Sequence, residues 1–427
     1  MKSFGQNYDK LIDHMQGIEV IDSHEHLPQE AERLATNPDF SKMFGHYCQS
    51  EMLSVGMTRA ELQSFLGESM PVEEKWALFE PYYRMIQDGS YARAAHIAIE
   101  KFYGMGRLTS LADALTLTKE IRSANKPGLY DRVLKEACNI RVSMNYCGTT
   151  DQQDSRYFEP VVFATGYVEV TRNTIRGLED EMQVSCGNLD SYVDAVREKQ
   201  RILKEQGNKG IKFHLAYMRD LQFAARTHAE AEQVFLRIME EGYGRRHTDL
   251  GYEEMRPLQD YMVHRFVEIA GEMDLPIVFH TGLQGDVDSN ADDCRPLRLW
   301  NLPHRYRNTD FLILHGGFPW LEDAALLAKQ YENVYLDLAW AHLMSPEIVA
   351  RSLRSWVDMI PMHKILGFGG DYCVVEKVYG QLVLAKQNIG SALAAKMDDG
   401  ALSFDRAKAW IQAMFYDNPN RLFRLGK

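Results

Sequence analysis

Eight short runs of apolar, β-type residues alternate with helical segments along most of this chain. They lie at residues 17–26, 140–146, 161–164, 210–215, 275–280, 311–315, 333–338 and 364–371. Most are apolar on both faces, as in the strands of a buried parallel sheet. This alternation predicts an α/β fold, and eight repeats favour a closed (β/α)8 barrel. An open, doubly wound sheet is the alternative, but no Gly-x-Gly-x-x-Gly turn follows the first run.

The segment between the first two runs has a helical pattern throughout. Thr58 to Glu61 has the spacing of a capping box, and Pro71 precedes acidic residues as at a helix start. We therefore predict that residues 29–137 form a helical insertion that caps the barrel mouth. The barrel itself is expected to consist of residues 1–28 and 138–427.

Length, charge and composition exclude several classes of protein. The chain has 427 residues, a net charge of −12, 45% hydrophobic residues and six scattered cysteines. The excess of acidic residues argues against nucleic-acid binding. The sequence contains no run of about 18 apolar residues, so no membrane span is predicted. Without a signal-peptide pattern, free thiols and a cytoplasmic location are expected. The expected partner is a small-molecule substrate, and a homo-oligomer is left open.

Polar residues of the metal-binding type stand at the ends of the predicted strands. The first strand ends in His24 and His26, which share a face because side chains alternate along a strand. The other ends read Lys212 or His214, then His280, His315 and Asp371. In a parallel barrel, the carboxyl ends of all strands meet at one mouth, so these groups should converge.

Any one of these residues alone is explained equally well as a buried histidine or a helix-capping aspartate. Their repetition at matching strand ends is harder to explain in that way. Glycines accompany His280, His315 and Asp371 and allow the backbone to turn sharply away from the strand. We therefore interpret the set as a metal site at the barrel mouth.

The motifs resemble those of the amidohydrolase superfamily. The resemblance rests on the His-x-His pair, on the histidines that end the fifth and sixth strands, and on Phe368-Gly369-Gly370-Asp371. It is closer to the second large branch, which holds decarboxylases of the aminocarboxymuconate-semialdehyde type and amidohydrolase-like domains linked to glutamine synthetase. It covers nearly all of residues 18–425. The helical insertion is also similar to that of uronate isomerases, whose other motifs are not evident.

Carried over by residue, the resemblance implies that His24, His26, His280 and Asp371 bind one divalent metal ion. Three neutral imidazoles and a carboxylate suit Zn²⁺, with Mn²⁺ or Fe²⁺ as alternatives. An open coordination position would activate a water molecule by lowering its pKa towards about 7. Asp371 would accept a proton from this water, and His315 would act beside it as a base or as an electrostatic anchor.

Four further residues are candidates for substrate binding. Lys212 is either a cation for a substrate carboxylate or, as in two-metal members of the superfamily, a carbamylated bridge; the single-metal interpretation is preferred. His214 shares the face of Lys212 by strand parity. Tyr217 and Arg219 follow and would bind an anionic substrate, although they are equally well explained as surface loop residues.

Three reactions are compatible with this site. The first is metal-dependent hydrolysis of an amide, ester or lactone of a small carboxylate-bearing substrate. The second is decarboxylation of a small acid, and the third is isomerisation of a sugar acid as in uronate isomerases. A catalytically silent barrel is the least favoured, because the ligand set is retained. Fold and ligands are shared among these reactions, so the pocket loops decide between them.

Overall fold

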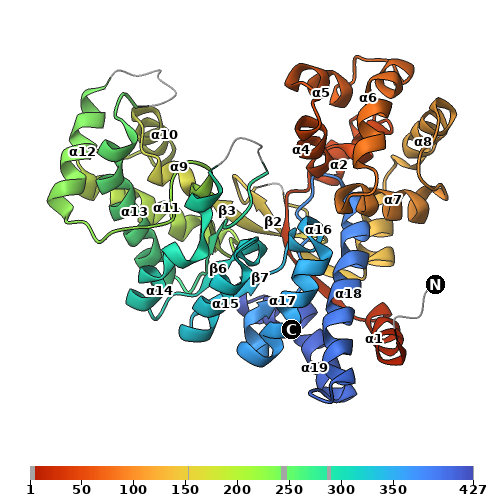
Figure 1. The fold of residues 1–427 in the computed structure, drawn as a ribbon. Helices are drawn as coiled ribbons and strands as arrows, with labels where there is room; N and C mark the ends of the chain where they lie inside the picture. The colour runs from red at the N-terminus through yellow and green to blue at the C-terminus, as the bar shows by residue number, and fades with distance from the viewer. Residues whose placement is uncertain (1–4, 152, 242–247, 286–289, 427) are drawn as a thin grey trace.

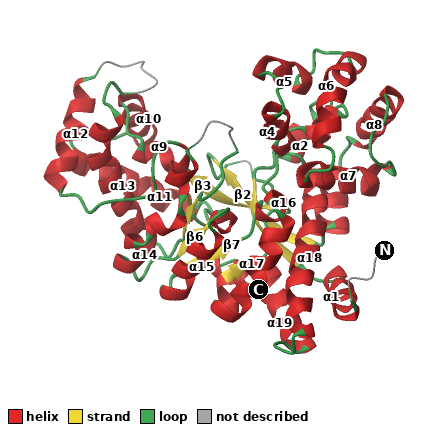
Figure 2. Cartoon of the chain, viewed as in Figure 1, coloured by secondary structure: helices red, strands yellow, loops and turns green. Residues whose placement is uncertain are grey.

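Eight parallel strands form the centre of the protein, as predicted. The computed structural model describes residues 5–151, 153–241, 248–285 and 290–426. The strands are β1 (Val20–Glu25), β2 (Ile140–Cys147), β3 (Phe158–Phe163), β4 (Ile211–Phe213), β5 (Ile277–Phe279), β6 (Phe311–Ile313), β7 (Val334–Asp337) and β8 (Ile365–Leu366). They pair in sequence order from β1 to β8. Helices surround them on the outside (Figure 2).

Backbone hydrogen bonds just beyond β8 join its end to β1 and close the barrel. The Ser23 N–H donates to the Phe368 carbonyl at 3.1 Å, and the Asp371 N–H donates to the His24 carbonyl at 2.7 Å. The interior is filled by alternate side chains of the strands. Val278 and Leu312 pack inside with other buried residues, whereas the flanking positions of β5 pack outward against helices. Both faces of the strands are therefore apolar, which explains their continuous hydrophobic runs.

A helical region is inserted after β1, as the sequence predicts. Its helices are α2 (Glu30–Leu34), α3 (Ser41–Phe44), α4 (Tyr47–Ser54), α5 (Arg59–Leu66), α6 (Val72–Ile86), α7 (Ser90–Tyr103), α8 (Leu111–Ala124) and the π-helix η1 (Asp131–Ala137). The predicted capping box is confirmed: Thr58 accepts from the Glu61 N–H at 3.1 Å, and Glu61 accepts from the Thr58 N–H at 2.8 Å. Figure 1 shows α4–α8 gathered on one side of the barrel, beyond the upper end of α18.

The remaining helices cover the barrel and extend from it. They are α1 (Gln6–Gln16), α9 (Thr165–Val168), α10 (Arg172–Met182), α11 (Leu189–Glu205), α12 (His228–Glu240), α13 (Tyr252–Glu272), α14 (Asn301–Arg305), α15 (Leu321–Gln330), α16 (Ala341–Met344), α17 (Pro346–Met359), α18 (Val375–Asp398), α19 (Phe404–Gln412) and α20 (Asn418–Leu422). Short 3-10 turns are η2 (Leu215–Tyr217), η3 (Ala291–Cys294), η4 (Pro296–Leu299), η5 (Leu314–Gly317) and η6 (Met362–Lys364), and η7 (Ala413–Asp417) is a π-helix. Among the described residues, no helix is both long and apolar enough to cross a bilayer.

A buried ion pair and a hydrogen bond join the inserted region to one barrel helix, α18. Arg33 of α2 donates to Glu376 of α18 at 3.0 Å, and the Tyr103 hydroxyl of α7 donates to the same carboxylate at 2.8 Å. The side chains of Arg33 and Glu376 are each 2% exposed. The insertion is thus tied to α18, the helix that directly follows the end of β8.

Candidate metal centre and pocket

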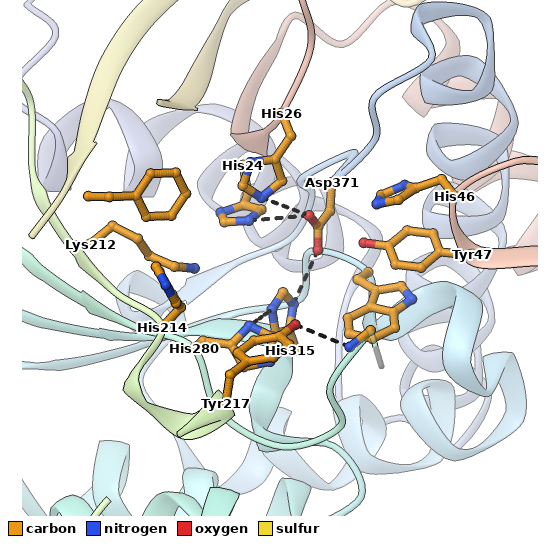
Figure 3. A pocket seen from close by; sticks show the side chains of 13 residues that line it. His24, His26, His46, Tyr47, Lys212, His214, Tyr217, His280, His315 and Asp371 are labelled. Atoms are coloured by element: carbon orange, nitrogen blue, oxygen red, sulfur yellow. Dashed lines mark hydrogen bonds and ion pairs between the residues drawn. The ribbon is translucent and has the colours of Figure 1, made fainter. Parts of the chain in front are cut away.

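Three of the predicted metal ligands meet at the carboxyl end of β1. The Nε2 atoms of His24 and His26 lie 3.3 and 3.4 Å from Oδ1 of Asp371. One ligand atom from each of the three residues lies within 4.8 Å of the other two. His24 and Asp371 are buried, and His26 is partly exposed towards the pocket. Figure 3 shows the two imidazoles turned towards the carboxylate.

Glycines bring Asp371 to this position. Asp371 has a φ of 55°, a left-handed conformation that non-glycine residues adopt rarely, and its N–H is held by the His24 carbonyl. A Cβ atom added at Gly370 would lie 1.6 Å from Oε1 of Glu25. The chain therefore needs glycine immediately before the ligand, so that the two strand ends can approach closely.

The electrostatics of the group favour metal binding. Burial lowers the pKa of His24 and of His26, so both imidazoles are held in the neutral form that ligates metals. Burial opposes ionisation of Asp371, but the neighbouring histidines, His24 foremost, hold the pKa of this carboxyl well below its usual range. Two neutral nitrogen donors and one carboxylate converge on one point, which is a donor set that fits Zn²⁺, Mn²⁺ or Fe²⁺.

The predicted ligand His280 lies beside this group but is hydrogen-bonded elsewhere. Its Nε2 is 3.1 Å from the Leu283 carbonyl, and its Nδ1 is 3.1 Å from Nε2 of His315. The Nδ1 atom of His315 lies 2.9 Å from the Ala339 carbonyl and 3.7 Å from Oδ2 of Asp371. The structure thus brings together His24, His26 and Asp371 as close neighbours, with the His280–His315 pair on the Oδ2 side. The ligand role of His280 stays a prediction.

Lys212 of β4 lies in the pocket wall and is almost fully buried. Its ammonium lies 5.0 Å from the centre of the Tyr146 ring, a cation–π distance. Burial lowers the pKa of Lys212 to about 7, although Asp371 and Asp337 oppose this shift. A buried cation facing a pocket is poorly compensated until an anion binds.

His214 and Tyr217 also line the pocket. Nδ1 of His214 is 3.2 Å from the Thr165 hydroxyl, and burial lowers the pKa of His214 to about 4. The Tyr217 hydroxyl accepts the Gly285 N–H at 3.1 Å, and its ring lies 4.7 Å from that of His280. Tyr217 therefore links the turn after β4 to the turn after β5.

Arg219, the fourth predicted substrate contact, points away from the pocket. It is 3% exposed. Its guanidinium donates to Asp260 at 2.7 Å and to Gln259 at 3.1 Å, both on α13, and to the Gln222 carbonyl at 3.0 Å. These bonds fix the loop after β4 to α13. A substrate contact by Arg219 is not supported by this geometry, since its donors are engaged in the protein interior.

The inserted region contributes two pocket residues that the sequence patterns did not identify. His46 and Tyr47 precede and begin α4 and face the metal ligands across the cavity (Figure 3). The Tyr47 ring stacks on Trp340 with 4.5 Å between ring centres. His46 has a φ of 58°, a strained conformation that is typical of functional sites. In the sequence, His46 and Tyr47 are a polar and an aromatic residue directly after Gly45. Such a pair is too common in a helical segment to indicate a functional site.

The cavity is small and largely aromatic. It has a volume of about 250 Å³. Its lining consists of His24, His26, His46, Tyr47, Phe163, Lys212, His214, Tyr217, His280, Gly285, His315, Trp340 and Asp371. Among these residues Lys212 is the one lysine or arginine.

Comparison with known protein families identifies the family of this chain. Residues 186–425, more than half of the sequence, match the Amidohydrolase family (Amidohydro_2). The chain belongs to the Amidohydrolase family. The matched segment includes His280, His315 and Asp371, whereas the His24–His26 pair lies N-terminal to it.

One curated relative and two solved structures illustrate what this chain is similar to. It is 28% identical over 184 residues to the protein fluG of Emericella nidulans, a match that covers 41% of this chain and 21% of fluG. The chain thus matches about a fifth of the length of this relative. A uronate isomerase from Thermotoga maritima has a TM-score of 0.80 at 14% identity, with 98% of this chain and 97% of that chain covered. A protein provisionally assigned as a metal-dependent hydrolase, from Lactobacillus casei, has a TM-score of 0.66 at 17% identity, with 97% of each chain covered.

Proposed function

We propose that this member of the amidohydrolase superfamily is a metal-dependent isomerase of a small sugar acid, converting an aldose form to the ketose form. The observation that carries the proposal is the three-residue ligand group of His24, His26 and Asp371. Because Nε2 of His280 is bound to the Leu283 carbonyl and its Nδ1 faces His315, two adjacent oxygens of a hydroxy-aldehyde have room to coordinate the ion. This differs from the hydrolase favoured by the sequence motifs.

The similarity to uronate isomerase supports the same choice. The match covers 98% of this chain, so it includes most of the inserted region as well as the barrel. In this chain the inserted region supplies His46 and Tyr47 to the pocket wall. The proposal therefore assigns the insertion a direct role in binding the substrate.

The reaction needs only a proton relay, and the pocket has the groups for it. A hydrogen on the carbon next to the carbonyl leaves as a proton and returns to the former carbonyl carbon, while the hydroxyl proton moves to the former carbonyl oxygen. No water is consumed. A bound divalent ion would polarise the carbonyl and acidify the neighbouring hydroxyl. Oδ1 of Asp371 faces the two histidines, which leaves Oδ2 to accept and return the carbon-bound proton.

Tyr47 and His315 are placed to assist this transfer. Burial and the charge of Asp371 raise the pKa of Tyr47, so the hydroxyl keeps its proton at neutral pH. Its hydroxyl points towards Asp371 (Figure 3). Nδ1 of His315 lies 3.7 Å from Oδ2 of Asp371. Lys212 would bind the carboxylate of the sugar acid, because the two groups carry opposite charges and face each other across a small cavity.

Hydrolysis of an amide or lactone is the second candidate. It is supported by His315, whose pKa burial lowers to about 4, so the neutral ring is available as a base near Asp371. Decarboxylation, the third predicted reaction, draws on the same ligand group, and no separate feature of the pocket favours it.

A substrate panel tests the proposal. The protein, loaded in turn with Zn²⁺, Mn²⁺ and Fe²⁺, is incubated with uronates, lactones, N-acyl amino acids and aromatic acids, and the products are followed by NMR in D₂O. We expect a ketose product from a uronate and none from the Asp371→Asn variant. Hydrolysis or CO₂ release without any isomerisation would contradict the proposal.

A further inference from the structure

We propose that Asp22 and Glu25, two buried carboxylates beside the ligand histidines on β1, are positioning residues that hold the metal ligand Asp371 in place. The inference rests on the metal-binding part of the proposed function and not on the identity of the substrate. It assigns a role to the central residue of the His-x-His motif, whose side chain points away from the pocket.

The two carboxylates bind the backbone on either side of Asp371. Oδ1 of Asp22 accepts the Gly370 N–H at 3.1 Å, and Oε2 of Glu25 accepts the Tyr372 N–H at 2.9 Å. The N–H of Asp371 itself is held by β1. Residues 370–372, here called the strap, therefore have all three successive N–H groups bound to β1.

The strap is also bound through a carbonyl group, since the Tyr372 carbonyl accepts the His26 N–H at 3.2 Å. Asp371 stands in a left-handed conformation, which a non-glycine residue keeps only where its surroundings enforce it. Gly370 leaves room for the Glu25 carboxyl group, because a Cβ atom added at this position would lie 1.6 Å from its Oε1. Position and conformation of the ligand are thus set by contacts with β1.

Burial of these acids is costly, which argues that they serve a purpose beyond packing. Both are 0% exposed, and none of the ion pairs among the described residues compensates them. Oδ1 of Asp22 also accepts the His24 N–H at 3.2 Å, and its Oδ2 accepts from the Ser143 hydroxyl at 3.3 Å. Buried acidic side chains destabilise a fold unless hydrogen bonds repay them, and here those bonds go to the strap and to the backbone of a metal ligand.

The consequence is a link between these acids and metal affinity. With the strap held in this way, Oδ1 of Asp371 lies within 3.4 Å of both histidine nitrogens. Releasing one end of the strap lets the carboxylate move, so the ion should dissociate faster. Residues that orient metal ligands typically change affinity by about 10–100-fold when removed.

Two pairs of variants separate hydrogen bonding from side-chain volume. Glu25→Leu and Asp22→Leu remove the acceptors, whereas Glu25→Gln and Asp22→Asn keep an acceptor oxygen of the same reach. We measure the Zn²⁺ dissociation constant by chelator competition and the visible absorption spectrum of the Co²⁺-loaded protein. We expect the leucine variants to bind Zn²⁺ about 10–100-fold more weakly with an altered Co²⁺ spectrum, and the amide variants to stay within about threefold of the wild type. Asp260→Asn, a buried acid on α13 away from the strap, is the control for general destabilisation.

Equal metal affinity and equal Co²⁺ spectra in the leucine variants and the wild type would overturn the inference. If the leucine variants do not fold, Gly370→Ala provides a second route, since its methyl group must displace the Glu25 carboxylate. We expect Gly370→Ala to weaken metal binding, and the double variant Gly370→Ala with Glu25→Ala to bind no more weakly than Glu25→Ala alone. Additive losses in the double variant would contradict the contact. Because none of these measurements uses a sugar acid, a protein that binds metal but does not isomerise uronates refutes the proposed reaction and leaves this inference standing.

Discussion

His280 and His315 face each other with 3.1 Å between Nδ1 of the first and Nε2 of the second. Each ring's other nitrogen lies against a carbonyl oxygen, which only accepts hydrogen bonds. Burial lowers the pKa of both rings, to about 4 for His315, so each carries a single N–H at neutral pH. The N–H group of each ring therefore points away from the other ring and donates to its carbonyl oxygen. The facing nitrogens present two lone pairs to each other, an arrangement that a substrate hydroxyl donating to either nitrogen would relieve.

This geometry leads to a prediction for His315. We expect His315→Ala to retain the metal ion and to lower kcat by about 10²–10⁴, because the residue assists proton transfer beside Asp371. Metal content and steady-state kinetics on the identified substrate are the measurements. Loss of the ion in this variant would instead make His315 a ligand.

Metal stoichiometry is the most direct test of the ligand group. The purified wild type should hold about one divalent ion per chain, and His24→Ala or Asp371→Asn should lose most of it, because each contributes one of three converging atoms. Elemental analysis of the proteins measures this. Full occupancy in both variants would exclude the site, and two ions in the wild type would favour a carbamylated Lys212 that bridges them.

Lys212 should make substrate binding depend on pH. Its pKa is lowered by burial to about 7, so the ammonium form that attracts a carboxylate is present below this pH and is lost above it. We expect kcat/KM to fall as the pH rises through about 7, and Lys212→Ala to raise KM and to keep the metal ion. Lys209→Ala, a partly exposed lysine outside the pocket, is the control. An unchanged KM in Lys212→Ala would remove Lys212 from substrate binding.

The ion pair between the insertion and the barrel predicts an effect on stability. Arg33→Ala leaves the buried carboxylate of Glu376 without its charged partner, so we expect a loss of about 3–5 kcal/mol in the free energy of unfolding. Arg84→Ala removes an exposed ion pair with Glu80 on α6. We expect it to change the free energy of unfolding by less than about 1 kcal/mol. Denaturant unfolding compares the two. Similar losses in both variants would show that burial of the first pair contributes little.

The order of the strands and the place of the site followed from the sequence alone. A parallel barrel brings the carboxyl ends of its strands to one mouth, so identifying the strands was enough to group His24, His26, Lys212, His280 and Asp371. The same local patterns predicted the insertion after β1 and its capping box. These features depend on contacts within a few residues or on a rule of topology, and neither requires side-chain coordinates.

Tertiary structure decided where the side chains beyond the strand ends point. Arg219 lies two residues from Tyr217, yet it turns inward to Asp260 on α13 while Tyr217 lines the pocket. His46 and Tyr47 enter the site from the insertion, about twenty residues after the strand that holds the histidines. The direction of a loop side chain depends on which distant partner satisfies its hydrogen bonds and charge, and that partner is known only once the chain has packed.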